Sequence, residues 1–122
     1  MRLKRIAPTF PVRDVRAALA YYERLGFATR EYGGDENAIY GFAAVGDVEL
    51  HVGIVPDGKP SVPATAYLYV EDADELAKEW TSAGGIVHPP QDTEWGQREG
   101  VLIDPDGNII RFGSPLRESE RG

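Results

Sequence analysis

The segment EWGQREGVLIDPDGNIIRF, residues 94–112, reads as two β-strands joined by a tight turn. Two apolar runs flank Asp106-Gly107, a dipeptide typical of hairpin turns. The second run contains a single charged residue, Arg111, and Trp95 lies in a loop just before the first run. The function predicted for the chain depends on whether these two side chains belong to a metal site or to a binding site.

The composition is that of one small globular domain. The chain has 122 residues, and 42% of them are hydrophobic, which suffices for a core. Cysteine is absent, which excludes disulfides, thiolate zinc sites and cysteine nucleophiles and fits a reducing compartment. No run approaches the roughly 18 apolar residues of a membrane span, and no signal-peptide pattern opens the sequence. We therefore expect a cytoplasmic protein.

Acidic residues are concentrated in the second half of the chain. The net charge is -7; residues 1–58 hold 7 basic and 8 acidic side chains, and residues 59–122 hold 6 and 12. A negative field repels nucleic acid and anionic membranes and attracts cationic partners. We expect neither nucleic acid nor membrane as a partner, although the acidity can also serve solubility only.

The sequence contains one structural unit twice, at an offset of 58 residues. Segment 10–27 matches segment 68–85, and each contains a strand, an aspartate, a helix with one apolar face and a glycine. Asp14 and Asp72 are placed to cap the two helices, and this explains them better than catalysis does. Trp80 falls on the apolar helix face and is assigned to the core.

Strand-like runs follow each helix, so the predicted fold class is α+β with two βαβββ modules, residues 1–58 and 63–116 of a single domain spanning 1–122. A short connector, residues 56–63, joins the modules. His88 is expected in an exposed loop. The expected strands and turns are residues 7–12, 27–32, 39–45, 48–55, 65–70, 86–90, 98–103 and 108–113, with turns at Gly33-Gly34, Gly46-Asp47 and Asp106-Gly107.

Side chains alternate across a strand, so the apolar residues that pack under the helices identify the inner face of each sheet. In the fourth strand Val48, Leu50 and Val52 suit the helix side, which sends Glu49 and His51 to the open face. The same reasoning predicts these further open-face residues: Ala7, Thr9 and Pro11 in the first strand, Thr65, Tyr67 and Tyr69 in the fifth, and Ile109 and Arg111 in the last.

The paired strand-Asp-helix openings, LGF at residues 25–27 and DPDGNIIRF at residues 104–112 resemble the glyoxalase, bleomycin-resistance and extradiol-dioxygenase superfamily, also called vicinal oxygen chelate proteins. The resemblance covers nearly the whole chain. It implies that the two modules curl into a cup-shaped mixed sheet with the helices on its outer face. It also implies a homodimer, with paired or swapped modules, that completes the cup.

Enzymes of that superfamily hold a divalent cation on the open faces, and the matching positions here are Ala7, Glu49 or His51, Thr65 and Arg111. Alanine cannot ligate, threonine rarely does, and arginine brings a permanent positive charge. Too few donors remain for tight binding. We expect no metal, no other cofactor and no catalytic residue, with Arg111 organising Glu49 or an anionic ligand group. A divergent metal-dependent lyase or oxygenase stays open as the alternative.

Segments 66–80 and 94–112 most resemble bleomycin-binding resistance proteins, a branch that is metal-free and sequesters its antibiotic. The resemblance implies a non-enzymatic protein, active in antibiotic resistance, that binds a bulky cationic or aromatic small molecule in a groove at the dimer interface. The expected ligand-binding residues are Tyr40, Phe42, Glu49, His51, Tyr67, Tyr69, Trp95, Arg98 and Arg111.

Several of these residues also have a structural interpretation. Glu49 and His51 can make ordinary hydrogen bonds, Tyr67 and Tyr69 can fill the groove, and Trp95 can plug a dimer interface. A regulatory or structural dimer with a filled cup is therefore a third hypothesis.

Overall fold

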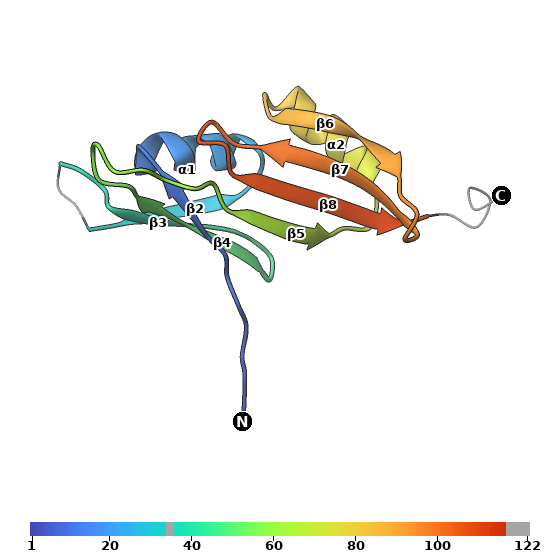
Figure 1. The fold of residues 1–122 in the computed structure, drawn as a ribbon, viewed down its shortest axis with the longest axis horizontal. Helices are drawn as coiled ribbons and strands as arrows, with labels where there is room; N and C mark the ends of the chain where they lie inside the picture. The colour runs from blue at the N-terminus through green and yellow to red at the C-terminus, as the bar shows by residue number, and fades with distance from the viewer. Residues whose placement is uncertain (34–35, 117–122) are drawn as a thin grey trace. The chain divides into compact units, whose positions relative to one another are not determined.

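The computed structural model describes residues 1–33 and 36–116, and its contacts divide the chain into two compact units, residues 1–64 and 65–122 (Figure 1). Each unit has one helix and one four-stranded mixed sheet, which confirms the α+β class and the βαβββ order. The unit boundary follows the expected connector directly. That both units form one domain stays a prediction.

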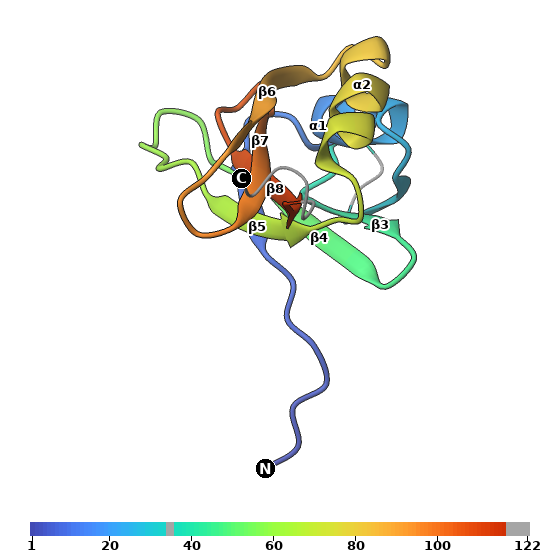
Figure 2. The same cartoon turned by 90° about the vertical axis from the view of Figure 1, so that its right-hand side faces the viewer.

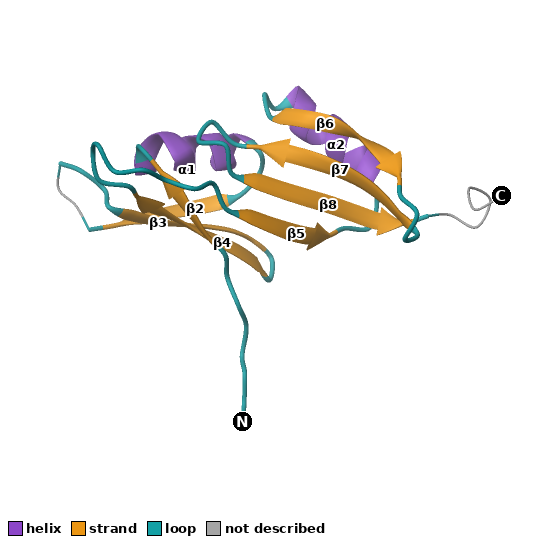
Figure 3. Cartoon of the chain, viewed as in Figure 1, coloured by secondary structure: helices purple, strands orange, loops and turns teal. Residues whose placement is uncertain are grey.

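The first unit has a sheet in the order β1-β4-β3-β2, with β1 parallel to β4 and the other pairs antiparallel. Helix α1 lies against β2, β3 and β4 (Figure 3). Its elements are β1 (Thr9–Val12), α1 (Val15–Arg24), β2 (Ala28–Tyr32), β3 (Tyr40–Val45) and β4 (Val48–Ile54).

The second unit repeats this plan in the order β5-β8-β7-β6, with β5 parallel to β8. Helix α2 contacts β6, β7 and β8 and lies to one side of their sheet (Figure 2). Its elements are β5 (Thr65–Tyr69), α2 (Ala73–Ser82), β6 (Ile86–Asp92), β7 (Gln97–Ile103) and β8 (Ile109–Pro115).

Both helices begin at the predicted aspartates. The Oδ1 atom of Asp14 accepts a hydrogen bond from the Ala17 N–H at 3.0 Å, and Oδ1 of Asp72 accepts one from the Glu75 N–H at 3.0 Å. These carboxylates satisfy N–H groups that have no partner within the helix. The N-cap interpretation is confirmed, and both aspartates have a structural role.

Aromatic side chains fill the two cores. In the first unit the ring of Tyr22 meets Phe27 edge to face at 5.6 Å. In the second unit Trp80 is 4% exposed, as predicted for a core residue, and packs edge to face on Phe112 at 5.2 Å. A Cβ atom at Gly100 would lie 2.6 Å from Cζ of Phe112, so this glycine lets the ring approach the backbone of β7 closely.

The DPDGN turn between β7 and β8 is held by a buried carboxylate. Asp104 is 2% exposed; its Oδ1 atom accepts hydrogen bonds from the N–H groups of Asp106 and Asn108, and its Oδ2 atom accepts one from Nδ2 of Asn108, each at 2.9 Å. Gly107 adopts a φ of +86°, which favours glycine. This turn sets the register of β7 against β8.

Two expectations need correction in β6. The strand continues to Asp92 instead of ending at Pro90, because the pairing with β7 shifts between His88 and Gln91. Such an irregularity accommodates prolines, which cannot donate to the ladder. His88 is exposed as expected, but it lies within the strand and not in a loop.

Other turn predictions have different outcomes. Gly46, with a φ of +56°, and Asp47 join β3 to β4 as predicted. In the turn expected at Gly33-Gly34, Gly34 lies outside the described residues. None of the helices in residues 1–33 and 36–116 has the length and apolar character needed to cross a bilayer.

Candidate functional site

The alternation predicted for the strands is seen in both sheets, with two corrections: Val48 at the start of β4 is 41% exposed and not packed, and Ala7 precedes β1, which begins at Thr9. In β4 the buried Leu50 and Val52 face α1, and His51 between them lies on the open face. In β8 the exposed Arg111 lies between two buried apolar residues. Each unit therefore presents its own open sheet face.

On the first unit, Tyr40, Phe42 and His51 gather on the open face. Phe42 is paired with His51 across β3 and β4, which settles the orientation of β3 around Gly41. The ring centroids of Phe42 and His51 lie 4.8 Å apart, and the Tyr40 ring lies 5.4 Å from each of them. These edge-to-face contacts form an aromatic cluster.

A chain of polar contacts crosses this cluster. The Tyr40 hydroxyl lies 2.9 Å from Nδ1 of His51 and 3.2 Å from Oγ1 of Thr9. On the other side of the ring, Nε2 of His51 lies 3.4 Å from Oε1 of Glu49, whose Oε2 atom lies 2.6 Å from the guanidinium of Arg5. The tautomer of His51 decides which of the Tyr40 hydroxyl and Nδ1 donates the hydrogen bond between them. Glu49 and His51 therefore both have partners within their own unit.

Arg5 was not predicted to take part in this cluster. It supplies the ionic partner of Glu49 from the segment before β1, and the pairing of Glu49 with Arg111 stays a prediction. Arg30 was also missed: its guanidinium lies 4.2 Å from the centroid of the Phe42 ring. This face thus carries cations as well as acids.

On the second unit, Tyr67 and Tyr69 form an exposed aromatic pair on β5. Their ring centroids lie 5.0 Å apart, and the side chains are 38% and 80% exposed. Burial and a hydrogen bond to Glu99 raise the pKa of Tyr67 to about 12. The pair offers flat apolar surface for stacking, with one hydroxyl already committed to a carboxylate.

The open face of the second unit also holds Gln97 and Glu99 of β7, which the sequence interpretation missed. Within residues 1–33 and 36–116, Oε1 of Gln97 and Oε2 of Glu99 are buried and accept no hydrogen bond. Alternation in QREGVLI places both on the face opposite Gly100 and Leu102, so the strand pattern contained this information.

A pocket of about 440 Å³ lies on this same face. It is lined by two acidic residues, Asp92 and Glu99, and by the cationic Arg111, and it adjoins the irregular part of β6. The lining residues are His88, Pro89, Gln91, Asp92, Thr93, Glu99, Val101 and Arg111.

Trp95 and Arg98 have different surroundings. Trp95 is 66% exposed in the turn between β6 and β7. Arg98 bonds to Asp74 of α2 at 3.2 Å and to Asp92 of β6 at 3.1 Å. These bonds brace α2 against the sheet, so we assign Arg98 a structural role, and its contact with a ligand stays a prediction.

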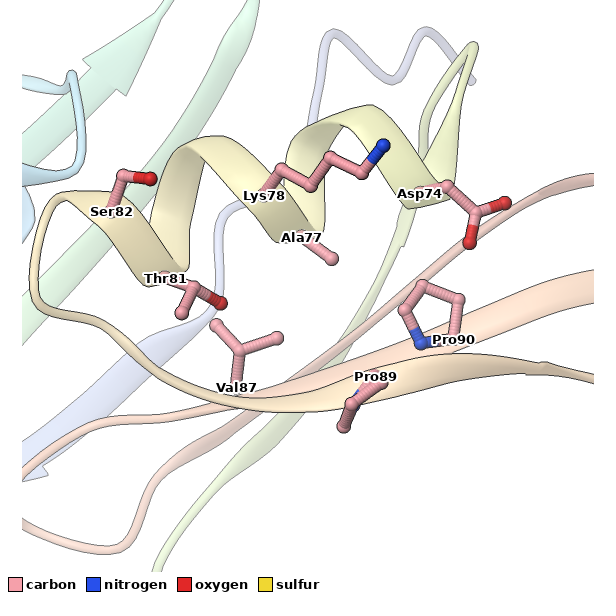
Figure 4. Close-up of a pocket in the computed structure, with 8 residues that line it drawn as sticks. All are labelled: Asp74, Ala77, Lys78, Thr81, Ser82, Val87, Pro89 and Pro90. Carbon is pink, nitrogen blue, oxygen red and sulfur yellow. The ribbon is translucent and has the colours of Figure 1, made fainter.

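A second pocket, of about 360 Å³, lies between α2 and β6 (Figure 4). Thr81 of the helix lies over Val87 of the strand there, Ala77 points towards Pro90, and Lys78 and Asp74 lie at the margin of the pocket. The residues expected to bind a ligand do not line it.

The residues at the positions that match the superfamily's metal ligands do not fit a divalent cation. Within each described unit, no three His, Cys, Asp or Glu side chains come together as a metal site would require. Glu49 and His51 are bonded to Arg5 and Tyr40, and the position in β8 holds the cationic Arg111.

Comparison with known proteins agrees on one family. The model of the Glyoxalase/Bleomycin resistance protein/Dioxygenase superfamily matches residues 2–112. A bleomycin resistance protein from Klebsiella pneumoniae is 30% identical over 116 residues, which cover 86% of this chain and 87% of that protein.

Two solved structures share the fold. A bleomycin-binding protein complexed with bleomycin gives a TM-score of 0.77 at 27% identity, covering 93% of this chain and 100% of that one. A bleomycin resistance determinant encoded on a transposon gives a TM-score of 0.79 at 25% identity, covering 94% of this chain and 100% of that one.

Proposed function

The chain belongs to the Glyoxalase/Bleomycin resistance protein/Dioxygenase superfamily, and on that premise we propose that it is a metal-free binding protein that sequesters a bulky cationic or aromatic small molecule. The open faces of its sheets supply the contact surface. The bound molecule is held by stacking and charge and is released unaltered.

The observation that carries the proposal is the exposed pair of Tyr67 and Tyr69. A tyrosine that is 80% exposed and packed at 5.0 Å on its neighbour contributes little to the core of its own unit. Each aromatic pair formed with a flat heterocycle is worth about 0.5–1.5 kcal/mol beyond the burial of area. An exposed aromatic platform is thus better suited to bind a planar guest than to stabilise the fold.

Charge supports the same class of ligand. The chain carries a net charge of -7, with its acidic excess in the second half, which holds this platform. Such a field raises the local concentration of cations and speeds their association. Bleomycin, which is bound in one of the similar structures, is the first compound to test.

We further propose that two copies of the chain form the groove between them. Each sheet has two edge strands, β1 and β2 in one and β5 and β6 in the other. Leu3 and Ile6, just before β1, are exposed apolar residues that a second copy could cover. A monomer by light scattering at micromolar concentration would contradict this part of the proposal.

The proposal is tested by titrating untagged protein with bleomycin while tryptophan fluorescence is recorded. We expect saturable quenching in the wild type and none in Trp95→Phe, because the remaining Trp80 is buried. Tyr69→Ala should weaken binding about tenfold or less, in keeping with the loss of one stacking contact. The control Tyr69→Phe keeps the ring and should bind as the wild type does.

Two results would count against passive capture. One is a full equivalent of divalent metal in the purified protein together with an activity that chelation abolishes, which would favour a lyase or oxygenase. The other is recovery of a chemically altered ligand. The cytoplasmic location and the exclusion of nucleic acid and membrane partners stay predictions.

A further inference from the structure

We propose that Glu99 and Gln97 of β7 select a positively charged N–H group of the ligand, of the amidinium, guanidinium or protonated-amine class. The inference rests on the proposed function of the open face and deepens it. It assigns the recognition of charge to two residues that stand beside the aromatic platform.

Each of the two residues has a hydrogen-bond acceptor without a donor in the described part of the chain. Oε2 of Glu99 and Oε1 of Gln97 are buried side-chain oxygens without a hydrogen-bond donor within residues 1–33 and 36–116. They lie two positions apart on one strand and therefore on one face of the sheet. Both atoms are acceptors, so a group that satisfies them has to be a donor.

A glycine in β8 allows the aromatic pair of Tyr67 and Tyr69 to lie close to Glu99. Gly113 is paired with Glu99 on one side and with Tyr69 on the other. A Cβ atom at Gly113 would collide with the Tyr67 hydroxyl, and it would lie 3.4 Å from Oε1 of Gln97. The missing side chain thus lets Tyr67 reach across β8 to the acceptors of β7.

The Tyr67 hydroxyl satisfies only part of the carboxylate. Its hydrogen bond to Glu99 contributes to the raised pKa of Tyr67, so the hydroxyl keeps its proton and acts as the donor near neutral pH. Oε2 of Glu99 is left over. A buried acceptor without a donor is costly, and a charged donor repays that cost most fully.

The arrangement discriminates between ligand groups. An ammonium or amidinium forms a hydrogen bond to Glu99 in which both partners are charged, a neutral amide forms a weaker one in which only Glu99 is charged, and a carboxylate is repelled. An aromatic ring attached to the cation would reach Tyr67 and Tyr69, which lie two strands away on the same sheet face. The ligand class is therefore a planar aromatic cation with N–H donors.

Arg111 lines the same pocket and is the group that could oppose this selection. Its side chain is exposed, so solvent and salt screen its charge far more than that of the buried Glu99 oxygen. Arg111 should therefore weaken the binding of a cation slightly and should not abolish it. The variant Arg111→Gln tests independently whether Glu99 or Arg111 determines the preference for a cationic ligand.

The test compares 2-naphthamidine, a planar aromatic amidinium, with 2-naphthamide, its neutral counterpart of the same shape. Both are titrated into the full chain by NMR, with bleomycin titrated in parallel. The wild type should bind the amidine at least about tenfold more tightly than the amide, since the attraction between opposite charges adds to the hydrogen bond with Glu99. This preference is measured without any variant.

Glu99→Gln should reduce the affinity for the amidine about tenfold and leave the affinity for the amide nearly unchanged. Glu79→Gln, the same change of charge on the exposed side of α2, is the matched control and should alter neither. Arg111→Gln should keep or increase the preference for the amidine. The buried Trp80 reports whether each variant is folded.

Equal affinity of the wild type for the two naphthyl compounds would overturn the inference, and so would a Glu99→Gln variant that keeps the preference. Loss of the preference in Arg111→Gln would do the same. If bleomycin still binds in these cases, the proposed function stands and only the role of Glu99 and Gln97 fails. If no aromatic compound binds the wild type, both proposals are wrong.

Discussion

Replacing Asp104 by alanine should unfold the protein more readily than most single substitutions. The carboxylate is 2% exposed and accepts three hydrogen bonds of 2.9 Å from the turn. Asn108, which donates two of them, is 1% exposed and would keep its donors inside the protein. The turn also sets the pairing of Ile103 with Ile109, from which the register of the whole hairpin follows.

The size of the effect can be estimated from these contacts. A hydrogen bond to a charged group contributes about 1.5–3 kcal/mol, and a buried donor left without a partner costs about 1–3 kcal/mol. Because Asp106 is partly exposed, water can replace its bond at a lower cost. We expect a loss of about 4 kcal/mol for Asp104→Ala, a large share of the roughly 5–15 kcal/mol that stabilises a typical domain.

The assay is urea unfolding in a Trp95→Phe background, in which fluorescence reports only the buried Trp80. Asp104→Asn should lose about 2 kcal/mol, because its amide meets the Asn108 amide donor to donor. The exchange Asp104→Asn with Asn108→Asp restores a donor facing an acceptor and should recover part of that loss. A cost below about 1 kcal/mol for Asp104→Ala would refute the reasoning.

Three further predictions concern the second unit. Tyr67 should ionise near pH 12 in a tyrosinate absorbance titration, and Tyr67→Phe should remove this late phase of the titration. A tyrosine in the unfolded chain ionises near pH 10. The contribution of Tyr67 to stability is therefore complete below pH 10 and is lost as the pH rises towards 12. Gly113→Ala should displace the Tyr67 ring and lower that pKa, which the same titration detects; an unchanged titration would contradict the close approach. Arg98→Met should lower the midpoint of urea unfolding by breaking the bonds to Asp74 and Asp92, at a cost of about 1 kcal/mol because the pairs are partly exposed, and it should leave bleomycin affinity unchanged.

The fold could be predicted from the sequence because local rules decide its parts. The helix ends depend on Asp14 and Asp72, whose carboxylates act on N–H groups only three residues away. The sheet face on which His51 and Arg111 lie follows from strand alternation, because their apolar neighbours in the strand lie on the opposite face. Because the sequence repeats at an offset of 58 residues, the strands and the helix assigned in one module support the same assignment in the other.

The site was harder to predict because its partners are distant in sequence. Arg5 and Glu49 form an ion pair across more than forty positions, and no periodic pattern links them. Strand alternation alone would have placed Glu99 on the open face, but the family resemblance favoured its neighbour Arg98 as the ligand-binding residue. Arg98 lies on the same side of β7 as Gly100 and therefore faces α2.

The shift in β6 was not foreseeable from periodicity either. Pro89 and Pro90 cannot donate hydrogen bonds, so a strand end was the simplest expectation. The structure instead continues the strand past the prolines, and His88 becomes part of a pocket wall. Such irregularities depend on the partner strand, which the local sequence does not describe.

Calorimetric titration of bleomycin into untagged protein, in buffer containing excess EDTA, tests the central claim most directly. If stacking and charge hold the guest, binding should saturate at one ligand per chain although every divalent cation is chelated. Binding that disappears in EDTA and returns when the protein is reloaded with a divalent metal would show that the open faces do not capture the guest by themselves.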